Sequence, residues 1–201
     1  MALLPEALAF LLLTHVIGDY ALQFDPVYKL KMSGTLWGLA IHVAIHIIVA
    51  EMLLLTGGIR NWLLLALLFS LHFTIDLLKL QLDTRFQFLA YIGDQILHLG
   101  CLLLLFWLFP QTETFIPNEL LTPLLLYSLV PFLTMTIWVW YSERQRRLRP
   151  DDEAILQKGF FGSMKRFSQY SAMPLLLGVI AWIPVQGVPL LELVMNNLNG
   201  V

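Results

Sequence analysis

The sequence predicts an all-α fold, a polytopic bundle of transmembrane helices. Hydrophobic residues make up 58% of the 201 residues and charged residues only 13%, a balance typical of integral membrane proteins rather than soluble domains. The apolar residues also gather in segments of about 20, the length that an α-helix needs to cross a bilayer. Six expected transmembrane helices occupy residues 3–24, 34–56, 60–82, 86–109, 119–141 and 172–195.

The distribution of lysine and arginine predicts the orientation. Eleven of the twelve basic residues lie in the first, third and fifth loops, and only Arg60 lies in a loop on the other side. Because basic residues concentrate in cytoplasmic loops, we expect these three loops to be cytoplasmic and both termini to be outside. The expected location is the bacterial cytoplasmic membrane.

Loop lengths divide the chain into two parts. Short loops join the first four helices, which favours an antiparallel four-helix core over residues 1–110. Residues 111–201 hold the other two helices and a long basic loop at about 142–171. In that loop Leu156, Phe160, Met164 and Phe167 follow helical spacing, which predicts an amphipathic helix at the membrane interface. Anionic lipid head groups are its expected partner, bound at the basic segment 144–167; a solvated connector is the alternative.

Polar residues inside the first four helices are the main functional signal. All five histidines lie there, and three aspartates join them to form four pairs, each four residues apart. Residues spaced in this way share one face of a helix, so each pair can point into the bundle. The pairs are His15 with Asp19, His42 with His46, His72 with Asp76, and Asp94 with His98.

Depth in the membrane supports a single site. In the predicted topology all four pairs fall in one layer of the cytoplasmic half, although the charge rule does not require this agreement. The order of the pairs also suggests a parallel repeat of two hairpins, of the kind that some transporters contain.

A metal site explains this cluster best. Intramembrane carboxylates are costly and must be paired or must bind a cation, and the sequence places no lysine or arginine at the expected depth. Histidine and carboxylate are common ligands of zinc, iron and manganese. We therefore expect one or two divalent ions, with zinc favoured, and all eight paired residues as candidate ligands.

Neighbouring residues have expected roles of their own. Gly18 and Gly93 each precede an aspartate of a pair, which suggests close helix packing. Gln23 and Gln95 can orient a ligand, contact substrate or bond between helices. Lys79 is expected to extend towards the interface, with an anionic group at the site as the alternative.

The stretch HVIGDYALQ (15–23) resembles the start of a family of small bacterial integral membrane proteins that form a domain of unknown function. The family pattern continues with two helix-2 histidines, then H-x-x-x-D-x-x-K and D-Q-x-x-H, and the match covers about residues 10–100. A looser similarity links the chain to membrane-bound metal-dependent hydrolases, although it lacks their usual His-Arg pairs. The residues that match the first family are His15, Gly18, Asp19, Tyr20, Leu22, Gln23, His42, His46, His72, Asp76, Lys79, Asp94, Gln95 and His98.

Four functions fit these observations. The favoured one is a metal-dependent hydrolase of a lipid-like or amphiphilic substrate, with Asp19 or Asp94 as general base where it is not a ligand. The others are a diiron-type redox enzyme acting on acyl chains, a transporter of divalent cations or protons, and a metal-stabilised accessory subunit. In the last case the final two helices would contact a second copy or a membrane partner. Nucleic-acid binding is not expected, because the only basic cluster flanks the membrane.

Overall fold

The computed structural model describes residues 5–23, 25–54, 62–81, 87–112, 116–148 and 159–185. These ranges contain seven α-helices and one π-helical segment, and no strand. The elements are α1 (Glu6–Val16), η1 (Ile17–Ala21), α2 (Asp25–Met32), α3 (Leu36–Leu54), α4 (Trp62–Gln81), α5 (Gln87–Leu108), α6 (Asn118–Leu148) and α8 (Gly159–Val185). The predicted all-α class is therefore confirmed.

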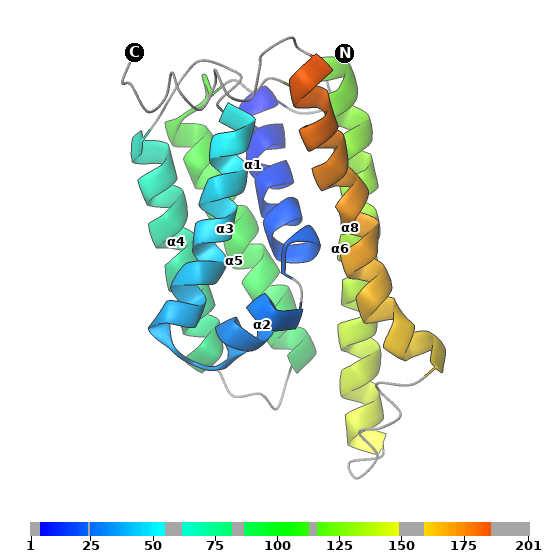
Figure 1. Ribbon diagram of the computed structural model, residues 1–201. Helices are drawn as coiled ribbons and strands as arrows, with labels where there is room; N and C mark the ends of the chain where they lie inside the picture. The colour runs from blue at the N-terminus through cyan, green and yellow to red at the C-terminus, as the bar shows by residue number, and fades with distance from the viewer. Residues whose placement is uncertain are drawn as a thin grey trace.

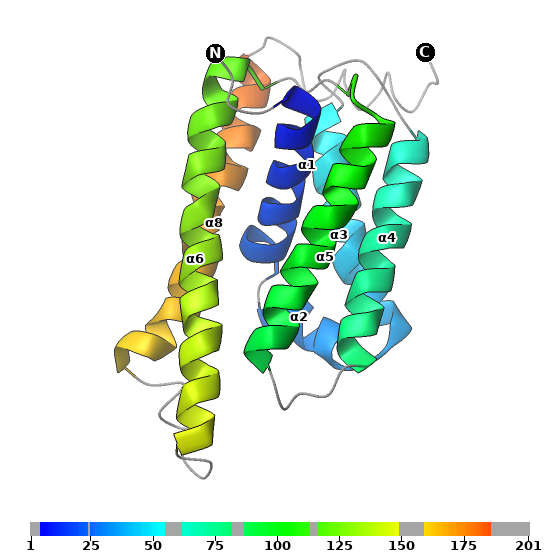
Figure 2. The same ribbon diagram turned by 180° about the vertical axis from the view of Figure 1, so that it is seen from behind.

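The helices that carry the polar pairs form a closed group of four. α1 packs on α3 and α5, and α4 packs on both α3 and α5. α6 and α8 pack on each other and cover the remaining side of α1 and η1 (Figures 1 and 2). As a result α1 is central, and most of its side chains, such as Phe10 and Leu13, are fully buried.

Four of the described helices are long and apolar enough to cross a membrane, which indicates an integral membrane protein. They are α3, α4, α5 and the part of α6 from Leu120 to Leu148; a fifth span results if α1, η1 and α2 count as one bent span. The six predicted spans, their orientation and the two-hairpin repeat therefore remain predictions.

The expected interfacial helix at about 142–171 is not a separate helix in the described residues. Residues 142–148 continue α6, and residues 159–171 form the first half of α8. Residues 149–158, which include Leu156, lie outside the described part of the chain. The described residues of the loop thus extend two long helices, and α8 continues through Pro174 into the apolar segment.

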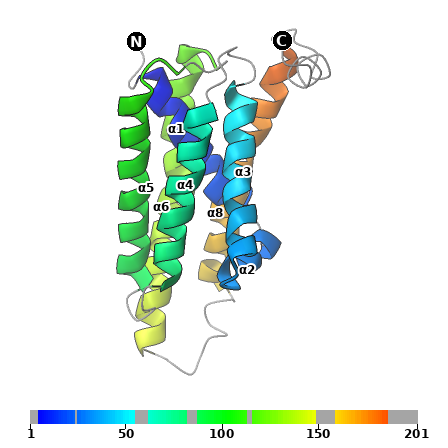
Figure 3. The ribbon, with the colours of Figure 1, turned by 90° about the vertical axis from the view of Figure 1, so that its left-hand side faces the viewer.

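The first loop is a helix in the structure, which sequence analysis missed. α2 lies across one end of the bundle, bent by 96° from the helix before it (Figures 1 and 3). Gly34, at a φ of 73°, makes the left-handed turn into α3. The Thr35 hydroxyl then caps α3 by accepting a hydrogen bond from the Gly38 amide at 3.1 Å.

Gly38 allows α2 to approach α3 closely. A Cβ atom built at Gly38 would lie 2.0 Å from the backbone oxygen of Leu30, so any larger residue must push the two helices apart. This contact fixes the position of α2, whose last turn carries a lysine of the polar cluster.

We predict that Gly38→Ala destabilises the protein by about 1–3 kcal/mol through overpacking. Gly100→Ala on α5 is the matched control, because a Cβ atom there meets nothing within 4 Å. Alanine also has the higher helix propensity, so the control should be neutral or slightly stabilising. Thermal unfolding in detergent measures both variants, and equal midpoints would contradict the close contact.

Candidate metal centre

The polar pairs of the sequence meet at one place inside the bundle. All eight paired residues belong to three groups in which the possible ligand atoms lie within 4.8 Å of one another. The groups share His72 and His98, so they form one continuous cluster. They consist of Asp19, His42, His46 and His72; of His15, His72 and His98; and of Asp76, Asp94 and His98.

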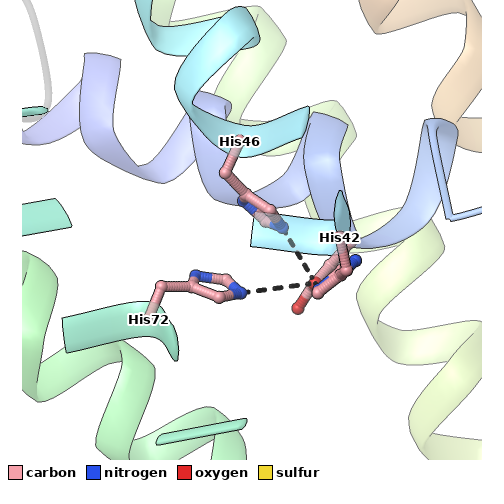
Figure 4. Close-up of side chains that lie close together, drawn as sticks. His42, His46 and His72 are labelled. Carbon is pink, nitrogen blue, oxygen red and sulfur yellow. Dashed lines mark hydrogen bonds and ion pairs between the residues drawn. The ribbon is translucent and has the colours of Figure 1, made fainter. Parts of the chain in front are cut away.

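The first group is arranged around the Asp19 carboxylate. Its Oδ1 atom lies 3.2 Å from Nε2 of His42 and 3.2 Å from Nε2 of His46, and 4.0 Å from Nε2 of His72. The three imidazoles converge from α3 and α4 (Figure 4). All three are at least 96% buried, whereas the Asp19 side chain retains 11% exposure.

Asp76 contacts two of the same imidazoles. Its Oδ2 atom is 3.3 Å from Nε2 of His42 and 3.4 Å from Nε2 of His72. Two carboxylates therefore flank the converging histidine nitrogens, an arrangement that attracts a cation.

The spacing fits a metal ion. Ligands at about 2.0–2.2 Å from a tetrahedral zinc lie about 3.3–3.6 Å from one another, and most of the distances here are 3.2–3.4 Å. Buried polar atoms normally have hydrogen-bond partners. Among the described residues, however, Nε2 of His42, Nε2 of His72 and Oδ2 of Asp76 have none. The donor set, its spacing and its unsatisfied atoms all fit a divalent cation.

Two neighbours set the histidine tautomers. The Nδ1 atom of His98 donates to the backbone oxygen of Asp94 at 2.9 Å, which leaves its Nε2 atom as an unprotonated ligand without a hydrogen-bond partner in the described chain. The amide nitrogen of Gln23 lies 3.4 Å from Nδ1 of His42, so in this structure the amide donates to Nδ1 and a neutral His42 carries its proton on Nε2. Binding of a metal ion by Nε2 of His42 requires the Gln23 amide to turn its oxygen towards the ring.

The π-helical segment places Asp19 in the cluster. Residues 17–21 widen the end of α1, and the Leu22 amide bonds to the Ile17 carbonyl five residues earlier at 3.0 Å. Such single π turns occur frequently at functional sites. Asp19 and His15 remain 3.5 Å apart across the junction.

Gly18 and Gly93 differ in how closely other residues pack against them. A Cβ atom at Gly18 would lie 2.4–2.7 Å from the His46 ring, so the imidazole occupies the space that a side chain would fill. A Cβ atom at Gly93 meets nothing within 4 Å. The close packing expected of Gly93 is therefore wrong, because its face of α5 is not covered by a described helix.

Two lysines enter the cluster, contrary to the expectation that no basic residue lies at this depth. The Nζ atom of Lys31 in α2 lies 2.6 Å from Asp76. The Nζ atom of Lys79 in α4 lies 2.5 Å from Asp94. The favoured prediction that Lys79 extends to the interface is wrong, since Asp94 is one helix away and the Tyr91 ring, at 6.0 Å, lies beneath the ammonium group.

The lysines leave one carboxylate without a lysine counter-ion. Asp76 pairs with Lys31 and Asp94 with Lys79, while the described contacts of Asp19 are with histidines. With neutral imidazoles the cluster has a net charge of −1, centred on Asp19. A single divalent cation at the first group is consequently favoured over two.

A hydrogen-bonded wall lies next to the cluster. The Tyr20 hydroxyl bonds to that of Tyr91 at 3.0 Å and to Oε1 of Gln95 at 3.4 Å. The Gln95 amide also donates to Asp94 at 3.1 Å. Sequence analysis did not identify Lys31 and Tyr91 as residues of the site. For Lys31, the available indication was its position close before the apolar helix α3.

The chain belongs to a family described as "Protein of unknown function (DUF3307)". The family model matches residues 7–122, just over half of the chain, and this range contains all eight paired residues. The predicted membership in a domain-of-unknown-function family is thereby confirmed. No curated protein and no solved structure gave a significant match.

We predict that Lys31→Met destabilises the metal-stripped protein by about 3 kcal/mol, because it leaves the Asp76 carboxylate buried without its counter-ion. Lys29→Met is the matched control, since Lys29 is exposed on the same helix two residues earlier. Unfolding in detergent with a chelator present measures both.

A second substitution tests the cause. Adding Asp76→Asn to Lys31→Met removes the unpaired charge, so the double variant should regain most of the lost stability. Equal stability of Lys31→Met and Lys29→Met, or no recovery in the double variant, would contradict a buried ion pair.

Proposed function

We propose that the protein is a membrane-embedded metal-dependent hydrolase that acts on a lipid-like substrate. Its metal ligands would be Asp19, His42, His46 and His72. The observation that carries the proposal is the convergence of three buried imidazole nitrogens on one carboxylate oxygen that none of the described lysines neutralises.

The donor set favours hydrolytic chemistry. Three histidines and one carboxylate suit zinc, and also iron or manganese. A divalent metal in such a site supplies Lewis acidity and an activated water. The residues of the chain then have to admit the substrate, hold its head group and manage protons.

A cavity gives access to the site. It has a volume of about 280 Å³ and is lined by Asp19, Gln23, Lys31, Lys79 and Gln95 among others. Asp19 is thus both a member of the first ligand group and part of the cavity wall, which brings a substrate in this cavity next to the ligand cluster.

Proton transfer falls to Asp94 in this proposal. One of its oxygens is held by Lys79 and Gln95, while Oδ1 has no hydrogen-bond partner in the described chain. A carboxylate fixed in this way, next to an ammonium group, can take a proton from a water and return it to a leaving group. Asp19 serves as ligand rather than base.

We expect the metal-replete protein to hydrolyse an ester or phosphoester of an amphiphile in detergent micelles. Asp19→Asn and His46→Ala should lower kcat/KM at least 100-fold, because each removes a ligand. Asp94→Asn should lower kcat with little change in KM, as expected for a base that acts in the transition state.

Controls separate this result from unfolding. Chelation should abolish hydrolysis and added zinc should restore it, and Glu51→Gln, near the C-terminal end of α3, should remain active. A metal-replete protein that hydrolyses no member of a library of lipid esters, amides and phosphoesters would contradict the proposal. A bound diiron centre would favour redox chemistry on acyl chains instead.

A further inference from the structure

Two cavities of opposite character meet at the candidate metal centre. The polar cavity of about 280 Å³ lies on the side of α2 and of the C-terminal end of α6. The second, of about 480 Å³, is lined mainly by apolar residues of α1, α5 and α6. Tyr20 and Gln95 line both.

Among the lining residues of the polar cavity that the structure describes, Lys31, Lys79 and Arg146 are basic and only Asp19 is acidic. Lys31 and Lys79 are paired with Asp76 and Asp94, so Arg146 is the basic group of this wall that is left to attract an anion. Arg146 uses one nitrogen to donate to Gln87. Its Nε atom is buried without a hydrogen-bond partner in the described chain, and it becomes a donor for an anion when the side chain turns this N–H towards the cavity.

The spacing of residues along α5 gives the length of the polar cavity. Gln87, Tyr91 and Gln95 lie on one face at intervals of four residues and all line it. Eight residues of helix correspond to about 12 Å. Arg146, bonded to Gln87, is therefore at one end of the cavity, and Gln95 is at the other, beside Asp94.

The apolar cavity continues along the same helix. Gln95, Leu99 and Leu102 line it, which extends the path by about 10 Å at 1.5 Å per residue. Ile96, Leu126 and Leu129 are 64%, 55% and 49% exposed and also line it, so its side is open to lipid. A hydrocarbon chain can enter there from the bilayer.

The candidate metal centre lies at the junction of the two cavities. His15 lines the apolar cavity and Asp19 lines the polar one, and their side chains are 3.5 Å apart. The Tyr20–Gln95 contact that separates the cavities is 3.4 Å long, at the weak end for a hydrogen bond. The Gln95 side chain is the part of the wall that can move aside.

We propose that the two cavities together bind one single-chain amphiphile with a phosphate-type anionic head group. The head group lies in the polar cavity near Arg146, and the chain lies in the apolar cavity along α5. The bond between head group and chain then lies at the Tyr20–Gln95 wall, next to the ligand cluster. This inference rests on the proposed function for its reaction, but binding alone can be tested without turnover.

The probe for the test is a long-chain alkyl phosphonate with a diazirine in its chain. Its carbon–phosphorus bond is not open to ester hydrolysis, so binding is measured separately from activity. After irradiation of the whole 201-residue chain in detergent, with and without metal, labelled peptides are quantified by mass spectrometry. We expect labelling concentrated on the α5 and α6 residues that line the apolar cavity.

Two pairs of variants locate the head group and the chain. Leu99→Trp, which fills the apolar cavity, should reduce labelling at least fivefold, while Leu97→Trp, 52% exposed and outside the cavity lining, should not. Arg146→Gln should reduce labelling at least fivefold. Arg144→Gln should not, because Arg144 is exposed and lies over the Trp140 ring.

Other outcomes have definite meanings. A trimethylammonium probe with the same chain should label at least fivefold less; equal labelling would overturn the anionic head group. Labelling spread evenly over the lipid-facing helices, or equal in each variant and its control, would overturn the two-cavity site. The expected labelling together with no hydrolysis of any substrate would leave this inference standing and reject the hydrolase.

Discussion

The arrangement of side chains inside this bundle depends on neutralising the negative charges of three buried carboxylates. Asp19, Asp76 and Asp94 lie within the cluster, where an unpaired charge costs several kcal/mol. Two are neutralised by lysines that reach them from neighbouring helices. For Asp19 the described partners are imidazoles, which supply a full counter-charge only by taking up a proton or by holding a cation. A metal ion satisfies Asp19 and the unsatisfied histidine nitrogens together.

Several features of the backbone serve this arrangement. The turn at Gly34 and the contact of Gly38 with Leu30 hold α2 across the end of the bundle, which carries Lys31 to Asp76. The π turn at residues 17–21 presents Asp19 to α3, and Gly18 leaves room for the His46 ring. The glycine and the aspartate of the H-x-x-G-D motif therefore act together: Gly18 leaves room for the His46 imidazole, and Oδ1 of Asp19 lies 3.2 Å from its Nε2 atom.

The convergence of the site could be expected from sequence because helical periodicity is strict. Residues four apart share a face in any regular helix, so four such pairs at one depth lead to a common interior. The length and apolar character of the helices follow from composition in the same way. The number of spans is less certain from sequence, because α1 with η1 is short and α2 lies crosswise.

The lysine partners could not be predicted, since they depend on tertiary geometry. Lys31 reads as a loop residue near the interface, and only the crosswise position of α2 brings it to Asp76. The contact of Lys79 with Asp94 was missed because it depends on the distance between α4 and α5. The sequence pattern of either helix alone does not contain that distance. The same limit applies to Tyr91 and Arg146, whose place in the polar cavity depends on how α5 and α6 pack.

The account depends on a metal ion at the Asp19 centre, and its most direct test is elemental analysis of protein purified in detergent without a polyhistidine tag. Wild-type protein should contain about one equivalent of a divalent metal, which Asp19→Asn and a His42→Ala/His46→Ala variant lose. His98→Ala should retain it, because His98 belongs to the other two ligand groups. Absence of metal from folded wild-type protein, even after incubation with zinc, iron or manganese, would contradict the account and leave a hydrogen-bonded polar core.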